Sequence, residues 1–509
     1  MANHQQVRTR LADLDALIVE QQALLDRLRE DRNVVQRQLS CIVYPVLSLP
    51  LDITLEIFRF CTSTDDHFAF WSPTVLLRIC RTWRDVASSN PALWKRISFN
   101  LNQTGRYMYT HHEETTMSGW NHQAKPRRWT GRRVQRYLDY RADIARDHSL
   151  SLYLRGSLVE CFGKTEFFTL IRGFAPRLQS LHLEIEGDSV IELDRHPLAF
   201  PLLEKLVLCL ENLRLSPIQP MLEPLERVFM NAPRLQHVIA DSGTFTNPIV
   251  FPWNQLVNFE GHNVTTGAAW HLLTTAKNLL QCSLSLIDDG TRSADLNPLC
   301  HVHLQSLALR GFRFYTWADP PEEYPDILSL LSLPSLRTLE LSDFREVDII
   351  QLTVFISRHS SQLLTFSFAQ CPAMGIPIDS LRSMVHLRTL TLELVDEHMA
   401  YIREFLRALE DSEQRFLPQI QHISFFRCQF ALDSAYVEML AHALSSRAGT
   451  STDNRLAQLR SFHLEFWAGS SVQDLVAMKK ASEEFRPSLA PLTELTKKGI
   501  RMYVGFRTK

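Results

Sequence analysis

The first segment of the chain carries apolar side chains at a spacing of roughly 3.5 residues. The apolar positions of this seam are Leu11, Leu14, Ile18, Leu25, Leu28, Val35, Leu39 and Ile42. No proline or glycine breaks the pattern before Pro45, so residues 1–44 are predicted to form a coiled-coil-like helix or a helical hairpin. Gln21 and Arg32 interrupt the seam. The pattern favours two alternatives equally: a homodimer formed through this helix, and packing of the helix on the chain's own next domain.

The pattern changes to short helical segments in residues 45–99. Leu49, Ile53 and Ile57 follow one another at four-residue spacing around a Leu-Pro step, which predicts a first helix. A second helix is predicted over residues 72–87, where the apolar side chains share one face. Those side chains are Val75, Leu76, Ile79, Cys80, Trp83, Val86 and Ala87.

A brief third helix is predicted after Asn90, because Asn is a favoured N-cap and Pro91 suits the first turn. This helix carries Leu93 and Trp94. Three short helices enclose a very small core, which a binding partner can help to complete.

Residues 100–135 are polar and basic without periodicity, which predicts a linker or an insertion. After them the phrase L-x-x-L-x-L recurs in eleven copies, about 28 residues apart. The copies start at residues 178, 203, 235, 256, 279, 304, 336, 363, 387, 420 and 459. SLSLYL (149–154) predicts a leading strand, and IRMYVGF (500–506) predicts a last strand or cap. Helical patterns lie between copies, at residues 400–409 and 434–444.

This alternation of strands and helices predicts an irregular α/β leucine-rich-repeat solenoid over residues 136–509, with a C-terminal cap. A generic all-helical or mixed array is the alternative. In such a solenoid the leucines stack into a continuous core, while the residues between them face a concave surface. A long, open surface of this kind suits the binding of another macromolecule.

Residues 47–97 resemble an F-box. The residues that carry the resemblance are Leu49, Pro50, Ile53, Ile57, Phe58, Cys80, Arg81, Thr82, Trp83, Ala87, Pro91, Leu93 and Trp94. The order of a heptad helix, this segment and degenerate leucine-rich repeats is similar to that of fungal F-box proteins. Residues 62–73 depart from the family pattern, because this link is longer and more aromatic than usual. The chain is therefore expected to be multidomain: a coiled-coil-like α-helix, a small all-α F-box and the solenoid.

The resemblance implies the substrate-recognition subunit of a cullin-RING (SCF-type) ubiquitin ligase. In that family the F-box docks a Skp-type adaptor and, through it, the cullin, while the repeats bind a protein substrate. The positions that match adaptor-binding residues are Leu49, Pro50, Ile53, Ile57, Phe58, Cys80 and Trp83. A non-degradative F-box scaffold, or a self-associating interaction protein, is the alternative.

Composition adds limits on partners and location. The 54 Lys and Arg nearly balance the 56 Asp and Glu, so no global charge attracts nucleic acid or an anionic membrane. The nine cysteines are scattered singly without a CxxC pair, which predicts neither a disulfide framework nor a zinc ribbon. No signal-peptide core or membrane-spanning apolar run occurs, so a cytoplasmic or nuclear location is expected.

Three segments could carry chemistry, and each has a simpler interpretation. In CHVH (300–303), strand alternation would place Cys300 on the face opposite His301 and His303, so no metal site is predicted. HHEE (111–114) is interpreted as solvated charge, and the basic, aromatic segment 124–137 as a solvated hinge rather than a site for nucleic acid. Common nucleotide-binding and hydrolase motifs do not occur, and neither enzymatic activity nor a cofactor is expected.

Overall fold

The computed structural model forms two compact units, Met1–Trp94 with Ile144–Arg146, and Lys95–Asp143 with Asp147–Lys509. Within them the structure describes residues 2–40, 49–62, 73–100, 131–156, 171–186, 198–211, 228–241, 250–287, 291, 296–311, 327–342, 349–369, 377–393, 399–411, 415–428, 434–448, 456–467 and 490–507.

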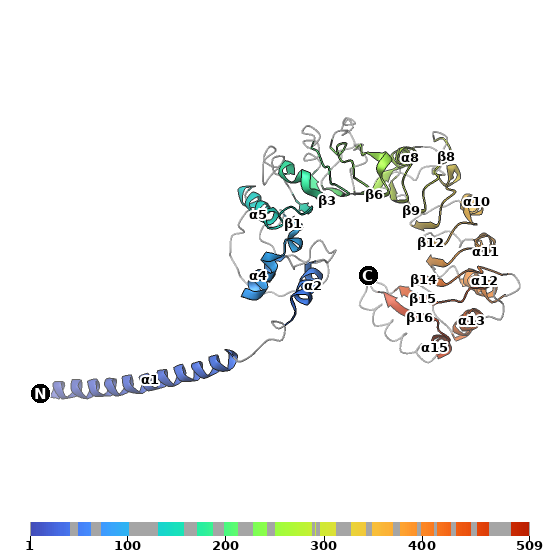
Figure 1. Cartoon of the computed structure of the whole chain (residues 1–509). Helices are drawn as coiled ribbons and strands as arrows, with labels where there is room; N and C mark the ends of the chain where they lie inside the picture. The colour runs from blue at the N-terminus through green and yellow to red at the C-terminus, as the bar shows by residue number, and fades with distance from the viewer. Residues whose placement is uncertain are drawn as a thin grey trace. The chain divides into compact units, whose positions relative to one another are not determined.

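The N-terminal pattern forms one helix, α1 (Ala2–Ser40), rather than a helical hairpin (Figure 1). Every side chain described between residues 4 and 39 is exposed, including the apolar seam. Leu25 and Leu28, for example, are 48% and 59% exposed. Within the chain itself, α1 thus keeps an uncovered apolar stripe.

Residues 49–94 are here called the helical unit, and their described part, 49–62 and 73–94, contains four short helices. They are α2 (Leu51–Thr62), α3 (Pro73–Ile79), α4 (Arg81–Ser89) and the 3-10 helix η2 (Pro91–Trp94). Pro50 lies directly before α2, and its carbonyl accepts hydrogen bonds from both the backbone N–H and the hydroxyl of Thr54, at 3.0 and 3.1 Å. As predicted, Pro91 begins the last of these helices.

The prediction of one continuous helix over residues 72–87 is wrong, because the helix is interrupted at Cys80, between α3 and α4. This residue has extended backbone angles (φ −154°, ψ 173°) and forms the N-cap of α4, with its sulfur accepting from Trp83 N–H at 3.4 Å. The side chain thus satisfies one of the backbone donors that a helix start leaves without an intrahelical partner.

Two aromatic contacts hold the helical unit together. The fully buried Phe58 of α2 meets Trp83 of α4 edge to face, with ring centroids 4.9 Å apart. The fully buried Trp94 of η2 donates its indole N–H to the Ala87 carbonyl at the end of α4, at 2.8 Å. The two contacts therefore join α2 to α4 and α4 to η2.

The second unit, here called the repeat region, is built on a 14-stranded sheet whose paired strands are all parallel. Its strands are β1 (Arg96–Asn100), β2 (Leu150–Arg155), β3 (Leu178–Glu186), β4 (Lys205–Glu211), β5 (His237–Asp241), β6 (Asn258–Thr265), β7 (Gln281–Ile287), β9 (Ser306–Arg310), β11 (Thr338–Ser342), β12 (Thr365–Ala369), β13 (Thr389–Glu393), β14 (His422–Cys428), β15 (Ser461–Trp467) and β16 (Arg501–Arg507). They follow one another in chain order, as a solenoid requires.

Each of the eleven predicted copies contributes one strand, and the predicted first and last strands are β2 and β16. The sequence pattern did not predict β1, which pairs with β2 at the start of the sheet. A separate short pair joins β8 (Leu299–Cys300) to β10 (Leu331–Ser332).

Helices connect many of the strands and lie on the outer side of the sheet in the repeat region (Figure 1). In the described residues they are α5 (Gly131–Ile144), α8 (Thr266–Thr275), α9 (Ile327–Leu330), α10 (Ile349–His359), α11 (Ile378–Arg382), α12 (Met399–Glu410), α13 (Ser434–Ser445) and α15 (Ala490–Lys497). The 3-10 turns η3 (Ala175–Arg177) and η4 (Trp253–Gln255) precede β3 and β6. The helices α12 and α13 coincide with the two predicted helical patterns, whereas α5 begins inside the predicted linker 100–135.

Alternation along the strands separates an apolar face from a polar face. Leu206, Val238, Phe259, Cys282 and Leu307 are aligned on successive strands and are all buried. On the other face, the residues aligned at the strand starts form what is here called the polar row. It consists of Arg96, Ser151, Ser180, Lys205, His237, Asn258, Gln281, Ser306, Thr338, Thr365, Thr389, His422, Ser461 and Arg501.

Candidate protein-interaction surfaces

The helical unit exposes several large apolar side chains. Their exposed fractions are 36% for Leu49, 60% for Leu51, 46% for Ile53, 79% for Phe60 and 51% for Ile79. A partner that covered these groups would gain about 25 cal/mol for each Å² of apolar surface removed from water.

The predicted adaptor-binding residues occupy three different environments. Leu49, Pro50 and Ile53 are exposed, while Ile57, Cys80 and Trp83 are half-buried. Phe58, also predicted to contact an adaptor, is fully buried against Trp83. We therefore correct the expectation for Phe58, whose side chain packs inside the helical unit and has no surface to offer.

The polar face of the repeat region contains a recess of about 510 Å³ that extends across β4 to β11. Its lining includes members of the polar row together with residues two positions further along the strands. The members of the polar row are Lys205, His237, Asn258, Gln281 and Ser306. The residues two positions further along are Ile239, Glu260, Ser283, Ala308 and Glu340. The recess thus offers both hydrogen-bonding groups and two carboxylates to a ligand.

The C-terminal end of the polar row has a different character. His422 lies 2.7 Å from the Ser461 hydroxyl, and the ring of His463 lies 4.2 Å from that of Tyr503, which is 49% exposed. Burial lowers the pKa of His422, and the charges of Arg460 and Arg501 lower it further. This end therefore presents aromatic surface and guanidinium charge, together with the Glu465 carboxylate, which lies 3.4 Å from His463 Nε2.

In the CHVH segment (300–303), the buried His301 has a structural role. His301 is 3% exposed, accepts from Leu304 N–H at 3.1 Å and contacts the Ala276 carbonyl at 2.9 Å. Its imidazole thus joins two neighbouring turns of the solenoid, while Cys300 is exposed. The HHEE segment lies outside the described residues, and the basic segment 124–137 is described only from Gly131.

The recess was not predictable from the sequence. Its walls come from strands of different repeats, and one sequence does not rank the polar-face positions against one another. The alternation within each L-x-x-L-x-L phrase indicated which side chains lie on the polar face. It did not indicate where along that face a recess lies.

Among the helices described, none combines the length and the apolar character that crossing a membrane requires.

Comparisons with known proteins give one family match. No curated protein matches the chain. Among solved structures, the chain is similar to an internalin from Listeria monocytogenes, with 11% sequence identity and a TM-score of 0.30, covering 58% of this chain and 71% of the internalin. Residues 46–100 match the F-box-like family, and this segment includes α2, α3, α4 and η2. By this match, the chain carries an F-box-like domain over residues 46–100.

Proposed function

We propose that this chain is the substrate-recognition subunit of an SCF-type cullin-RING ubiquitin ligase. The observation that carries the proposal is the combination, on one chain, of an F-box-like segment with exposed apolar side chains and a long parallel sheet with a polar, recessed face. The first surface suits a Skp-type adaptor, and the second suits a protein substrate.

For the adaptor, the proposed contact residues are Leu49, Pro50 and Ile53, with Ile79 beside the α3–α4 break. Phe58 and Trp83 act from within, because their edge-to-face contact fixes α2 against α4. An apolar surface held on rigid helices binds with little loss of conformational entropy. The cullin would be reached through the Skp-type adaptor.

For the substrate, the proposed surface is the polar face of a leucine-rich-repeat solenoid. The polar row provides side chains that can hydrogen-bond a partner along the sheet, and the recess provides a place for a projecting side chain. Polar and charged groups on such a face contribute specificity, because a wrong partner leaves them desolvated and unpaired.

The proposed mechanism is proximity and requires no catalysis by this chain. A substrate held on the repeat region has a high effective concentration near the ubiquitin-charged enzyme, which makes transfer to a lysine nearly intramolecular. Such a receptor would work in the cytoplasm or the nucleus.

A second candidate function is a self-associating F-box scaffold. The observation that favours it is the exposed apolar seam of α1, which a second copy of the chain could cover as a coiled coil. A scaffold of this kind would bind the adaptor without directing its partner to ubiquitination.

The test is affinity capture of the full chain followed by mass spectrometry. A triple variant with Leu49→Ala, Ile53→Ala and Ile79→Ala is compared with wild type and with Ile350→Ala, a control residue that is 74% exposed on α10. We expect adaptor and cullin with wild type and the control but not with the triple variant. Their absence from folded wild type, or equal recovery with the triple variant, would overturn the proposal.

Receptor and scaffold are separated by reconstitution with the adaptor, cullin and ubiquitin-conjugating enzyme. Ubiquitin transfer to a captured partner, lost in the triple variant, identifies a receptor. Capture of the adaptor without transfer to any bound partner favours the scaffold.

A further inference from the structure

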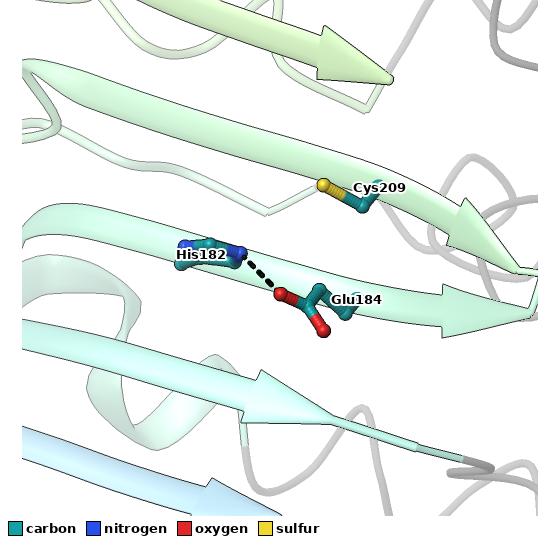
Figure 2. A group of neighbouring side chains, drawn as sticks. All are labelled: His182, Glu184 and Cys209. Carbon is teal, nitrogen blue, oxygen red and sulfur yellow. Dashed lines mark hydrogen bonds and ion pairs between the residues drawn. The ribbon is translucent and has the colours of Figure 1, made fainter. Parts of the chain in front are cut away.

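Three potential metal ligands converge on the polar face near the start of the repeat region. His182 and Glu184 lie on β3 and Cys209 on β4, and their ligand atoms all lie within 4.8 Å of one another (Figure 2). Glu184 and Cys209 are direct register partners in the parallel β3–β4 pair. Rigid neighbouring strands rather than mobile loops therefore hold the three side chains together.

The carboxylate of Glu184 is held in a fixed position by its neighbours. One oxygen accepts from the Tyr153 hydroxyl at 2.8 Å and lies 3.1 Å from His182 Nε2. The other forms an ion pair with Arg155 Nε at 2.9 Å. These contacts fix the orientation of the carboxylate.

The imidazole of His182 is similarly restrained. It is 8% exposed, and its ring meets that of Tyr153 edge to face with centroids 4.3 Å apart. Tyr153 therefore touches both side chains, and its hydrogen bond to Glu184 is of the kind that orients a metal-ligating carboxylate.

We propose that His182, Glu184 and Cys209 bind a divalent transition-metal ion, with zinc as the best match to a donor set of nitrogen, oxygen and sulfur. Nitrogen and oxygen ligands lie about 2.0 to 2.1 Å from tetrahedral zinc, which places them roughly 3.3 Å apart. The separation of 3.1 Å between His182 Nε2 and Glu184 Oε1 is close to that value. The sulfur of Cys209 lies within 4.8 Å of both atoms, and binding requires it to reach the zinc distance of about 2.3 Å.

Binding has a simple proton balance. The Cys209 thiol releases its proton to solvent and binds as thiolate, while neutral His182 offers the Nε2 lone pair from the tautomer protonated at Nδ1. The carboxylate keeps its contacts with Tyr153 and Arg155 as outer partners. The Arg155 charge opposes a cation, and the new thiolate charge offsets it.

Three protein ligands leave one position of a tetrahedral ion open. Because the site lies on the polar face, that position is accessible to water or to a donor side chain of a bound protein. The proposal does not depend on the F-box, so loss of adaptor binding would leave it unaffected.

The first test is titration of the purified full chain with Co²⁺, followed by optical absorption. We expect thiolate-to-cobalt charge-transfer absorption at one ion per chain in wild type and in Cys300→Ser, an exposed cysteine on β8. It should be lost in Cys209→Ser, and Tyr153→Phe should weaken affinity about 10-fold. Charge transfer that persists in Cys209→Ser, or none in wild type, overturns the proposal.

A second measurement needs no variant. Alkylation of each cysteine by N-ethylmaleimide is followed by peptide mass spectrometry with and without Zn²⁺. We expect zinc to slow modification of Cys209 at least about 10-fold, in line with a thiolate engaged by metal, and to leave Cys300 unchanged. Equal rates at Cys209 with and without zinc would contradict the site even if the serine variant fails to fold.

Discussion

The sulfur of Cys80 accepts a hydrogen bond from the backbone N–H of Trp83 at 3.4 Å, which makes the cysteine the N-cap of α4. Ser and Thr oxygens fill this role more often. The contact changes the interpretation of Cys80, because the side chain starts a helix rather than lying along one.

We expect Cys80→Ala to destabilise α4 by about 1 kcal/mol through loss of the cap, and Cys80→Ser to preserve it. The measurement is hydrogen exchange of the Trp83 amide, which should accelerate in Cys80→Ala alone. Equal acceleration in both variants would mean that the cysteine acts through packing and not through the cap. Adaptor binding should fall little in Cys80→Ala and much in Trp83→Ala, since the tryptophan holds Phe58.

A second prediction compares two phenylalanines of α2 that lie two positions apart. Phe58 is fully buried, whereas Phe60 is 79% exposed. Phe58→Ala should destabilise the helical unit by about 3 to 5 kcal/mol, because it removes a large core side chain and leaves a cavity. Phe60→Ala should change stability by less than about 0.5 kcal/mol.

Hydrogen exchange across α2 and α4 measures both changes within the full chain. If Phe60→Ala abolished adaptor capture while its exchange matched wild type, Phe60 would join the proposed adaptor surface. Similar protection in Phe58→Ala and wild type would show that the Phe58–Trp83 contact does not hold the helices together.

The third prediction concerns the pH dependence of the repeat region near His359. This imidazole is 4% exposed, donates from Nδ1 to the Phe355 carbonyl at 2.8 Å and accepts at Nε2 from Leu333 N–H at 2.9 Å. Burial lowers its pKa, the bond to Phe355 partly opposes this, and the Arg358 charge reinforces it. The arrangement requires neutral imidazole, because a protonated ring cannot accept from Leu333.

The folded pKa lies below the unfolded value of about 6.5, so the unfolded chain binds the proton first as the pH falls. The stabilisation is present above that value and is lost as the pH decreases through the folded pKa. We expect exchange of the Leu333 amide, corrected for intrinsic rates, to accelerate below about pH 6.5.

The matched variants are His359→Gln and His386→Gln, the second at an exposed histidine. The pH effect should flatten in the first and persist in the second. An unchanged effect in His359→Gln would assign it to another group.

The seam of α1 gives the fourth prediction. Leu25→Asp with Leu28→Asp should convert a homodimer into a monomer, because two charges would enter the apolar interface. Val19→Asp is the control, since Val19 is 69% exposed but lies off the 3.5-residue seam. Sedimentation velocity of the full chain measures the change, and monomeric wild type at tens of micromolar would contradict self-association through α1.

The outcomes for particular residues show how far the sequence could predict the fold. Each L-x-x-L-x-L phrase combines strand alternation with a fixed spacing to the next copy, so one strand per copy was predictable. The segment that forms β1, RISFN, is a single short run, and its pairing with β2 depends on residues about fifty positions away. The interruption of the helix at Cys80 was also not predictable, because the apolar pattern continues across this residue.

The candidate sites depended on information that the pattern does not contain. His182 and Cys209 belong to different repeats, and the register between β3 and β4 brings them together. Likewise, Phe58 continues the apolar pattern of its exposed neighbours in α2. Only the packing of α2 on α4 shows that Phe58, and not Phe60, is buried in the core of the helical unit.

The recess of the repeat region gives the last prediction. Ala308 lies within it on β9, on the polar face, so Ala308→Tyr should fill the space without entering the apolar core. The matched control is Thr391→Tyr, which occupies the corresponding position on β13, outside the recess lining. We expect quantitative capture to show loss of repeat-bound partners in the first variant only, with adaptor recovery unchanged in both. If both variants retained every partner, the recess would not be part of the substrate surface; if both lost them, binding would extend along the sheet and would not depend on the recess alone.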